Sequence, residues 1–282
     1  MRVWFITGAS RGFGALITQE ALNAGDAVVA TARNPQTIID RFGNHPNLLA
    51  VSLDVTNETQ AFAAAEQAVK RFGHIDILLN NAGYGLLGAV EEATAAEVEK
   101  LYATNVFGLL NVTRAVLPHM RRQRSGHVLN ISSIGGYTGF PGWGVYGSTK
   151  FAIEGLSESL AVEVKPLGIN VTVVEPGFFR TDFLDEASLA ISPSSIADYE
   201  QTPAGAMRDF AAGKNHGQPG DPARFAKAMI MLASAENPPL RMPFGTDAIA
   251  AIEAKNASVA KELADWRDLG ASTDFPAETT AA

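Results

Sequence analysis

The chain has 282 residues, 46% of them hydrophobic and 18% charged, which fits a folded domain with a sizeable core and excludes a disordered chain. A net charge of −8 argues against non-specific binding to nucleic acid or to a membrane surface. With no cysteine and five scattered histidines, we expect no disulfide, no thiol chemistry and no metal site. The first apolar run, residues 3–6, is too short for a signal peptide or a membrane span, so we expect a cytoplasmic protein.

Apolar runs of strand length alternate with helical patterns from the first residues to about residue 180. The runs are continuously apolar, which is typical of parallel strands that are covered on both faces. The sequence therefore predicts an α/β fold with a doubly wound parallel sheet, a Rossmann fold with three layers (helices, sheet, helices). The expected strands are residues 3–6, 27–31, 48–53, 75–79, 127–132, 170–174 and 240–244, and the expected helices are residues 15–24, 58–72, 97–117, 146–165, 222–235 and 247–268.

Residues 183–222 are rich in Ser, Pro, Gly and Ala, and they have few periodic apolar positions. Such a stretch inside a compact protein is more often a functional lid than a plain connection. We therefore expect one domain over 1–282, with a cofactor-binding and catalytic core over about 1–182 and a substrate lid over about 183–222. The C-terminal helices and the last strand complete the domain over about residues 222–270. The apolar side chains of the lid favour an apolar or mixed substrate.

A glycine-rich turn, TGASRGFG at residues 7–14, lies between the first strand and the first helix. Gly8 allows the tight turn, Gly12 lets the backbone approach a pyrophosphate, and Gly14 allows close helix–sheet packing. Free N–H groups at the helix N-terminus attract phosphate. A glycine turn without a ligand is the alternative, but the position in a doubly wound fold favours a dinucleotide site. The expected contacts from this turn are Gly8, Ser10, Arg11, Gly12, Phe13 and Gly14.

The end of the second strand predicts which dinucleotide is bound. An NAD site needs a carboxylate there for the ribose 2′-hydroxyl. This strand ends in Arg33 instead, and Arg11 in the glycine turn is able to reach the same position. Two guanidinium groups suit a 2′-phosphate. The sequence therefore predicts NADP(H), the alternative being that both arginines are solvated surface residues.

Over about residues 1–182, the order and spacing of the motifs resemble those of the classical short-chain dehydrogenase/reductase family, in particular its NADP(H)-preferring members. The glycine spacing and the lack of a large C-terminal substrate domain argue against the related nucleotide-sugar epimerases. The resemblance implies an oxidoreductase that moves a hydride between NADP(H) and a carbonyl or secondary alcohol. It also implies three sets of cofactor contacts: Asp54 and Val55 at the adenine, Asn81, Ala82 and Gly83 at the ribose, and Pro176, Gly177 and Thr181 at the nicotinamide. The catalytic residues that it implies are Asn105, Ser133, Tyr146 and Lys150. Asn105, Tyr146 and Lys150 are also expected to adjoin the cofactor.

Tyr146 and Lys150 are four residues apart, so they share one face of a helix. A neighbouring ammonium group, together with the positive nicotinamide ring of the oxidised cofactor, favours phenolate, so we expect the pKa of Tyr146 to fall below its ordinary value of about 10. In reduction, Tyr146 then protonates the substrate oxygen as general acid. Ser133 ends a strand thirteen residues earlier, the interval usual in the family, and can polarise that oxygen.

The resemblance gives two further roles. Lys150 holds the nicotinamide ribose, and Asn105 positions a water molecule that relays protons to Lys150. The alternative for Asn105 is that its amide satisfies a neighbouring carbonyl.

Three aromatic residues, Trp143, Phe178 and Phe179, flank the predicted site. They can line an apolar substrate pocket, and plain core packing is the alternative. Asp54 has an alternative role as a turn-capping residue.

For the whole protein the rival function is a catalytically idle NADP(H)-binding sensor or scaffold, which has no need of all four catalytic residues. We expect a small-molecule carbonyl or alcohol substrate and a homo-oligomer, dimer or tetramer.

Overall fold

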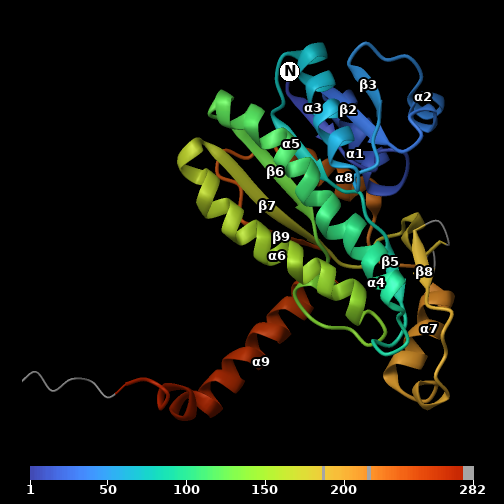
Figure 1. Cartoon of the computed structure of the whole chain (residues 1–282), viewed down its shortest axis with the longest axis vertical. Coiled ribbons are helices and arrows are strands. Elements are labelled where there is room, and N and C mark those ends of the chain that lie inside the picture. Colours follow the sequence, from blue (N-terminus) through green and yellow to red (C-terminus); the bar gives the residue numbers. More distant parts are fainter. Residues whose placement is uncertain (186–187, 215–216, 276–282) are drawn as a thin grey trace, which may run out of the picture.

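The computed structural model describes residues 1–185, 188–214 and 217–275, and within them a seven-stranded sheet has the order β3-β2-β1-β4-β6-β7-β9 (Figure 1). All its neighbouring strands pair in parallel. The chain builds outward from β1 to β3 and then returns to the other side of β1 with β4. This confirms the doubly wound Rossmann fold and places a topological switch point between β1 and β4. The strands are β1 (Val3–Ile6), β2 (Ala27–Ala32), β3 (Leu48–Ser52), β4 (Ile77–Asn80), β6 (Gly126–Ile131), β7 (Ile169–Pro176) and β9 (Arg241–Phe244).

Helices cover both faces of this sheet because successive side chains of a strand point to opposite sides. In β1, Val3 and Phe5 join the core beneath α3, α5 and α6, whereas Trp4 and Ile6 join the core beneath α1, α2 and α8. All four side chains are fully buried, which explains the continuously apolar sequence. The helices of the layers are α1 (Gly12–Asn23), α2 (Gln36–Phe42), α3 (Glu58–Phe72), α5 (Gly108–Gln123), α6 (Gly144–Val164) and α8 (Pro222–Leu232).

The helix expected over residues 97–117 is present, but it is longer and is not one regular α-helix. The structure has α4 (Ala95–Tyr102), then one π-helical turn (Ala103–Phe107), then α5. A π turn adds a residue without changing composition, so the apolar pattern did not reveal it. Asn105, a predicted catalytic residue, lies in this turn.

The lid region is more regular than its sequence predicts. It contains β8 (Leu189–Ile191), which pairs in parallel with β5 (Gly85–Leu87), and the helix α7 (Pro203–Lys214). Figure 1 shows both elements beside α4, at the carboxyl-end side of the main sheet. A three-residue strand whose partner is about one hundred residues away has no local signal in the sequence, so β8 was not predicted.

The helix α2 was not predicted either, because Ile38 is its one fully buried side chain and gives no apolar period.

The last helix, α9 (Thr246–Ala271), leaves the body of the protein after its first turns, as Figure 1 shows. Every residue from 256 to 271 is exposed, among them Leu263 and Trp266. In the part of the chain that the structure describes, no helix is both long and apolar enough to cross a membrane.

Candidate active site

A cavity of about 760 Å³ lies at the carboxyl ends of the strands, where the segments after β1, β2, β3, β4, β6 and β7 meet. This is the crevice in which ligands bind in open α/β sheets. Of the predicted site residues, only Gly14 and Asn105 do not line it. The predicted residues that line it are Gly8, Ser10, Arg11, Gly12, Phe13, Arg33, Asp54, Val55, Asn81, Ala82, Gly83, Ser133, Trp143, Tyr146, Lys150, Pro176, Gly177, Phe178, Phe179 and Thr181.

The glycine turn has the geometry that a phosphate site needs. Gly8 and Gly12 have φ of 66° and 52°, in the left-handed region that favours glycine. A Cβ atom on Gly14 would lie 2.3 Å from the carbonyl oxygen of Gly8, so α1 begins in close contact with the turn. Among the described residues no side chain caps the first N–H groups of α1, and Gly12 has open space where a side chain would be. These residues therefore fit the pyrophosphate of a dinucleotide.

Thr7 and Asn81 tie the glycine turn to the segment after β4. The Thr7 hydroxyl accepts hydrogen bonds from the N–H groups of Asn81 and Ala82, at 2.9 and 3.0 Å. The Asn81 amide donates to the carbonyl oxygens of Thr7 and Gly8, at 2.9 and 3.1 Å. The two loops at the switch point are thus one unit. The role of Thr7 was missed, although its position directly before the first glycine was a usable signal.

The segments after β1, β2 and β3 carry the two predicted arginines and Asp54. Arg11 and Arg33 both line the cavity and are both exposed. The Asp54 carboxylate accepts hydrogen bonds from the N–H and the hydroxyl of Thr56, at 3.0 and 2.7 Å. Asp54 therefore has the turn-capping role that was its alternative, and it borders the cavity as well.

Ser133, Tyr146 and Lys150 meet where β6 ends. Lys150 Nζ donates to the carbonyl oxygen of Ile131 at 2.9 Å and lies 5.7 Å from the centre of the Tyr146 ring. Tyr146 and Ser133 interact through a side-chain hydrogen bond, and the Ser133 hydroxyl also accepts from the N–H of Gly135 at 3.0 Å. The helix α6 and the strand β6 thus bring three polar groups, predicted from spacing, to one wall of the cavity.

The electrostatics of this group differ from the expectation. Burial raises the pKa of Tyr146 above its ordinary value, and the hydrogen bond with Ser133 opposes this only in part. For the groups that the protein itself supplies, the net change in the Tyr146 pKa is therefore upward, whereas the expected lowering was for Lys150 together with the positive ring of the oxidised nicotinamide. Burial lowers the pKa of Lys150 to about 8, and the carboxylate of Glu154 opposes that change. The lysine is thus poised close to neutral pH, and the tyrosine stays protonated there.

Asn105 lies next to this group but behind the cavity wall, 1% exposed. Its side-chain oxygen accepts from the N–H of Tyr84 at 3.1 Å, and its amide donates to the Tyr84 carbonyl at 3.0 Å. The backbone role that was its alternative is therefore present. A Cβ on Gly83 would lie 3.1 Å from Asn105 Oδ1 and 3.8 Å from Lys150 Nζ, so both residues border the same glycine.

The segment after β7 is held by the start of α9, a contact that the sequence did not reveal. The N–H of Phe178 donates to Asp247 Oδ2 at 2.8 Å. A Cβ on Gly177 would lie 2.3 Å from Asp247 Oδ1, so this position has no room for a side chain. Thr181 accepts from the N–H of Phe183 at 3.4 Å. The C-terminal helix therefore fixes the segment after β7.

The three predicted pocket aromatics differ in their surroundings. Trp143 lies 5.6 Å, centre to centre, from the Tyr146 ring and stacks at 6.4 Å with Phe183, which comes from the lid region. Phe179 packs instead against Phe13 and Phe225, at 5.4 and 5.2 Å, as part of the core. Trp143 and Phe183 therefore form an apolar wall beside Tyr146, whereas Phe179 mainly supports the fold.

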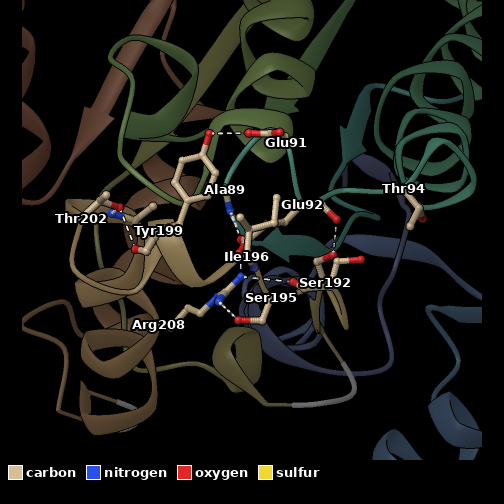
Figure 2. A network of polar contacts seen from close by, with 12 residues as sticks. Ala89, Glu91, Glu92, Thr94, Ser192, Ser195, Ile196, Tyr199, Thr202 and Arg208 are labelled. Atoms are coloured by element: carbon tan, nitrogen blue, oxygen red, sulfur yellow. Dashed lines mark hydrogen bonds and ion pairs between the residues drawn. The ribbon is translucent and has the colours of Figure 1, made fainter.

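A buried carboxylate attaches the lid to the loop after β5. Glu92, 2% exposed, accepts hydrogen bonds from the N–H groups of Ala89 and Ile196, at 2.7 and 3.0 Å, and forms an ion pair with Arg208 of α7. Figure 2 shows these partners around Glu92, with Tyr199 donating to Glu91 at 2.8 Å nearby. Burial alone would raise the pKa of Glu92, but these bonds outweigh burial and hold it below its ordinary value.

The fold and this site define the class of protein. Residues 2–191 match the model of the short chain dehydrogenase family, so the chain belongs to that family. It is an oxidoreductase whose relatives transfer a hydride with a nicotinamide cofactor and act on small molecules.

Particular relatives cover nearly the whole chain. Oxidoreductase BOA17 of Botryotinia fuckeliana is 37% identical over 95% of this chain and 97% of its own length. The 3-ketodihydrosphingosine reductase of Bacteroides thetaiotaomicron is 38% identical over 86% of this chain and 88% of its own. A solved structure of a short-chain dehydrogenase from Streptomyces avermitilis superposes with a TM-score of 0.88, at 40% identity, over 97% of this chain and 100% of that one. A structure of ElxO with NADP bound superposes with a TM-score of 0.72, at 29% identity, over 88% of this chain and 99% of that one.

Proposed function

We propose that this protein is an NADP(H)-dependent carbonyl reductase, or alcohol dehydrogenase in the reverse direction, with Asn105, Ser133, Tyr146 and Lys150 as its catalytic residues. The observation that carries the proposal is the meeting of Ser133, Tyr146 and Lys150 on the wall of the cavity that also contains the glycine turn. A bound nicotinamide supplies the hydride in reduction or accepts it in oxidation.

The side chains handle the proton. The hydroxyl groups of Ser133 and Tyr146 donate hydrogen bonds to the substrate oxygen and stabilise the charge that develops on it. Tyr146 then gives up its proton as general acid. The phenol is protonated at neutral pH, as a general acid in the reductive direction must be. The Lys150 ammonium, held against β6, stabilises the phenolate that remains, and Asn105 lies next to it for the proton relay.

The remaining predicted contacts serve the cofactor. The glycine turn and α1 hold the pyrophosphate, Arg11 and Arg33 hold the 2′-phosphate, and Asp54 with Val55 borders the adenine. Residues 81–83 adjoin the ribose, and Pro176, Gly177 and Thr181 border the nicotinamide. Exposed guanidinium groups at the cavity edge support NADP(H), as does the NADP-bound relative.

Trp143 and Phe183 favour a substrate with an apolar group beside its carbonyl. The name of the 3-ketodihydrosphingosine reductase relative agrees with such a substrate. The cytoplasmic location and the homo-oligomer stay predictions.

The direct test uses purified protein, NADPH and a panel of ketones with alkyl and aryl groups of increasing size. The proposal expects absorbance loss from NADPH that is faster with apolar ketones, and a weaker reaction with NADH. If calorimetry shows NADPH binding but no carbonyl is reduced, the protein is the idle sensor or scaffold instead.

A further inference from the structure

A second polar cluster lies behind the catalytic group, away from the cavity. Glu154 lies one helical turn after Lys150 on α6, Glu175 lies directly before the Pro176-Gly177 segment, and Ser132 lies directly before Ser133. None of the three lines the cavity. The cluster is therefore next in sequence to Ser133 and Pro176 and one helical turn from Lys150, but its side chains do not reach a ligand in the cavity.

The two carboxyl groups of this cluster are deeply buried. Glu175 is fully buried and Glu154 is 5% exposed. Arg241 on β9 places its Nε atom 3.3 Å from Glu154 and 3.4 Å from Glu175, and its other end forms an ion pair with the half-exposed Glu158. The ring of Tyr137 covers the Arg241 guanidinium at 5.8 Å. One cation thus faces two buried carboxyl groups and a third at the surface.

Two ionised carboxylates here would be poorly stabilised. Apart from the Ser132 hydroxyl beside Glu154 and the Arg241 guanidinium, no donor among the described residues pairs with the four oxygens of Glu154 and Glu175. Buried polar atoms are normally satisfied, and like charges that share a site do not both ionise. One proton held between the two groups removes the conflict, because it adds a hydrogen bond between them and leaves a single negative charge.

The titration behaviour agrees with this arrangement. Burial, with the Glu154 charge next, raises the pKa of Glu175 to about 8, while Arg241 opposes the rise. Burial also raises the pKa of Glu154, against the influence of Ser132 and Arg241. Of the two carboxyl groups, Glu154 is the one that acts on Lys150, since its charge opposes the effect of burial there.

We propose that Glu154 and Glu175 share one proton, and that Glu154 is a positioning residue whose negative charge keeps Lys150 an ammonium. With Lys150, Arg241, Glu158 and the singly charged pair, the positive and negative charges of the cluster balance. The pair acts through Lys150 and does not touch the substrate. The catalytic consequence rests on the proposed function, but the charge of Lys150 itself does not.

The two carboxyl groups are distinguishable because their replacements have different effects. In Glu154→Gln the negative charge remains on Glu175 of β7, so Lys150 loses its support. In Glu175→Gln the amide donates to an ionised Glu154, so the charge next to Lys150 is kept. The Lys150 titration, followed by NMR of 13Cε-labelled lysine and assigned with Lys150→Met, should move from near pH 8 to about pH 7 in Glu154→Gln. It should not fall in Glu175→Gln.

Glu158→Gln is the matched control, since Glu158 lies one turn further along α6 and also pairs with Arg241. It should leave the Lys150 midpoint in place. Equal lowering in Glu154→Gln and Glu175→Gln, or no lowering in either, overturns the proposal. If ketone turnover is present, the high-pH limb of kcat should follow the same pattern. If turnover is absent, the lysine titration still decides the proposal independently of the proposed function.

A measurement on the wild-type chain tests the shared proton even if the variants do not fold. NMR of protein labelled at the glutamate carboxyl carbon should show a carboxyl that is still protonated at pH 7 and titrates near pH 8. A spectrum in which every glutamate has ionised by pH 6 overturns the shared proton.

Discussion

The glycine turn and the lid border the same cavity, but they are held in place differently. The turn is tied by Thr7 and Asn81 into the loops between neighbouring strands of the sheet. The lid is attached by the pairing of β8 with β5 and by the buried carboxylate of Glu92, whose ion pair with Arg208 joins residues 116 positions apart. A site on the sheet edge is positioned by the whole fold, whereas the lid depends on one short strand pair, a small apolar cluster and the polar contacts of Glu92. Cofactor binding and substrate handling should therefore be separable by mutation.

The strongest disruption of the cofactor side is Gly14→Ala. The added methyl group would lie 2.3 Å from the Gly8 carbonyl oxygen and 2.6 Å from the Asn81 amide nitrogen, so α1 has to move away from the turn. We expect NADPH affinity to fall about 100-fold, equivalent to about 3 kcal/mol, as measured by calorimetry. Gly155→Ala is the control, because Gly155 lies in α6 with open space around it, and it should bind NADPH normally. Unchanged binding by Gly14→Ala would show that the contact with the turn is not needed.

Arg33→Ala tests the cofactor choice without disturbing the sheet. Loss of a charged hydrogen bond to the 2′-phosphate should weaken NADPH about 20-fold and leave NADH nearly unchanged. The ratio of the two dissociation constants is the readout. An equal weakening of both cofactors would contradict the assignment of the 2′-phosphate to Arg33.

Arg208→Ala weakens the lid and should leave the cofactor side intact. It removes the cation that faces the buried Glu92, and an unpaired buried charge destabilises its surroundings. We expect kcat/KM for a ketone to fall about tenfold, while NADPH affinity stays at the wild-type value. Arg224→Ala, at an exposed ion pair on α8, is the control and should change neither quantity. A loss of NADPH affinity in Arg208→Ala would mean that the lid and the cofactor side are not independent.

Lowering the pH below 4.5 should give the smallest effect, a loosening of the attachment of the lid by Glu92. Since the bonds of Glu92 hold its pKa below 4.5, its contribution to lid attachment is complete above pH 4.5 and is lost as pH falls through the lowered pKa. Trp143, stacked on Phe183, reports the lid by its fluorescence, and Trp266→Phe removes the signal of an exposed tryptophan. We expect a fluorescence change below pH 4.5 that Glu92→Gln removes. A change that persists in Glu92→Gln would assign it to another group.

The same contrast explains what the sequence could predict. The main strands and the glycine turn were found because continuous apolar runs and a glycine spacing are local signals. The attachment of the lid by Glu92, and of the Phe178 segment by Asp247, depends on single polar side chains that meet residues far away in the chain. Such contacts leave no periodic pattern.

The charges of the site were harder to predict than its residues. The sequence predicted Tyr146 and Lys150 as neighbours on one helix face, but it did not predict that burial raises the Tyr146 pKa in the protein without its cofactor. Burial is set by the packing of Trp143 and Phe183, which the sequence did not place. The glutamate pair behind Lys150 likewise became visible only when α6, β7 and β9 were seen together.

The most direct test of the account is Tyr146→Phe, measured by stopped-flow absorbance of NADPH with the best ketone of the panel and by calorimetry of NADPH binding. Because the ring still fits beside Trp143 while the proton donor is gone, we predict that hydride transfer slows about 1000-fold and that NADPH affinity is unchanged. Transfer at a rate close to that of the wild-type protein would contradict the role of Tyr146 as the general acid.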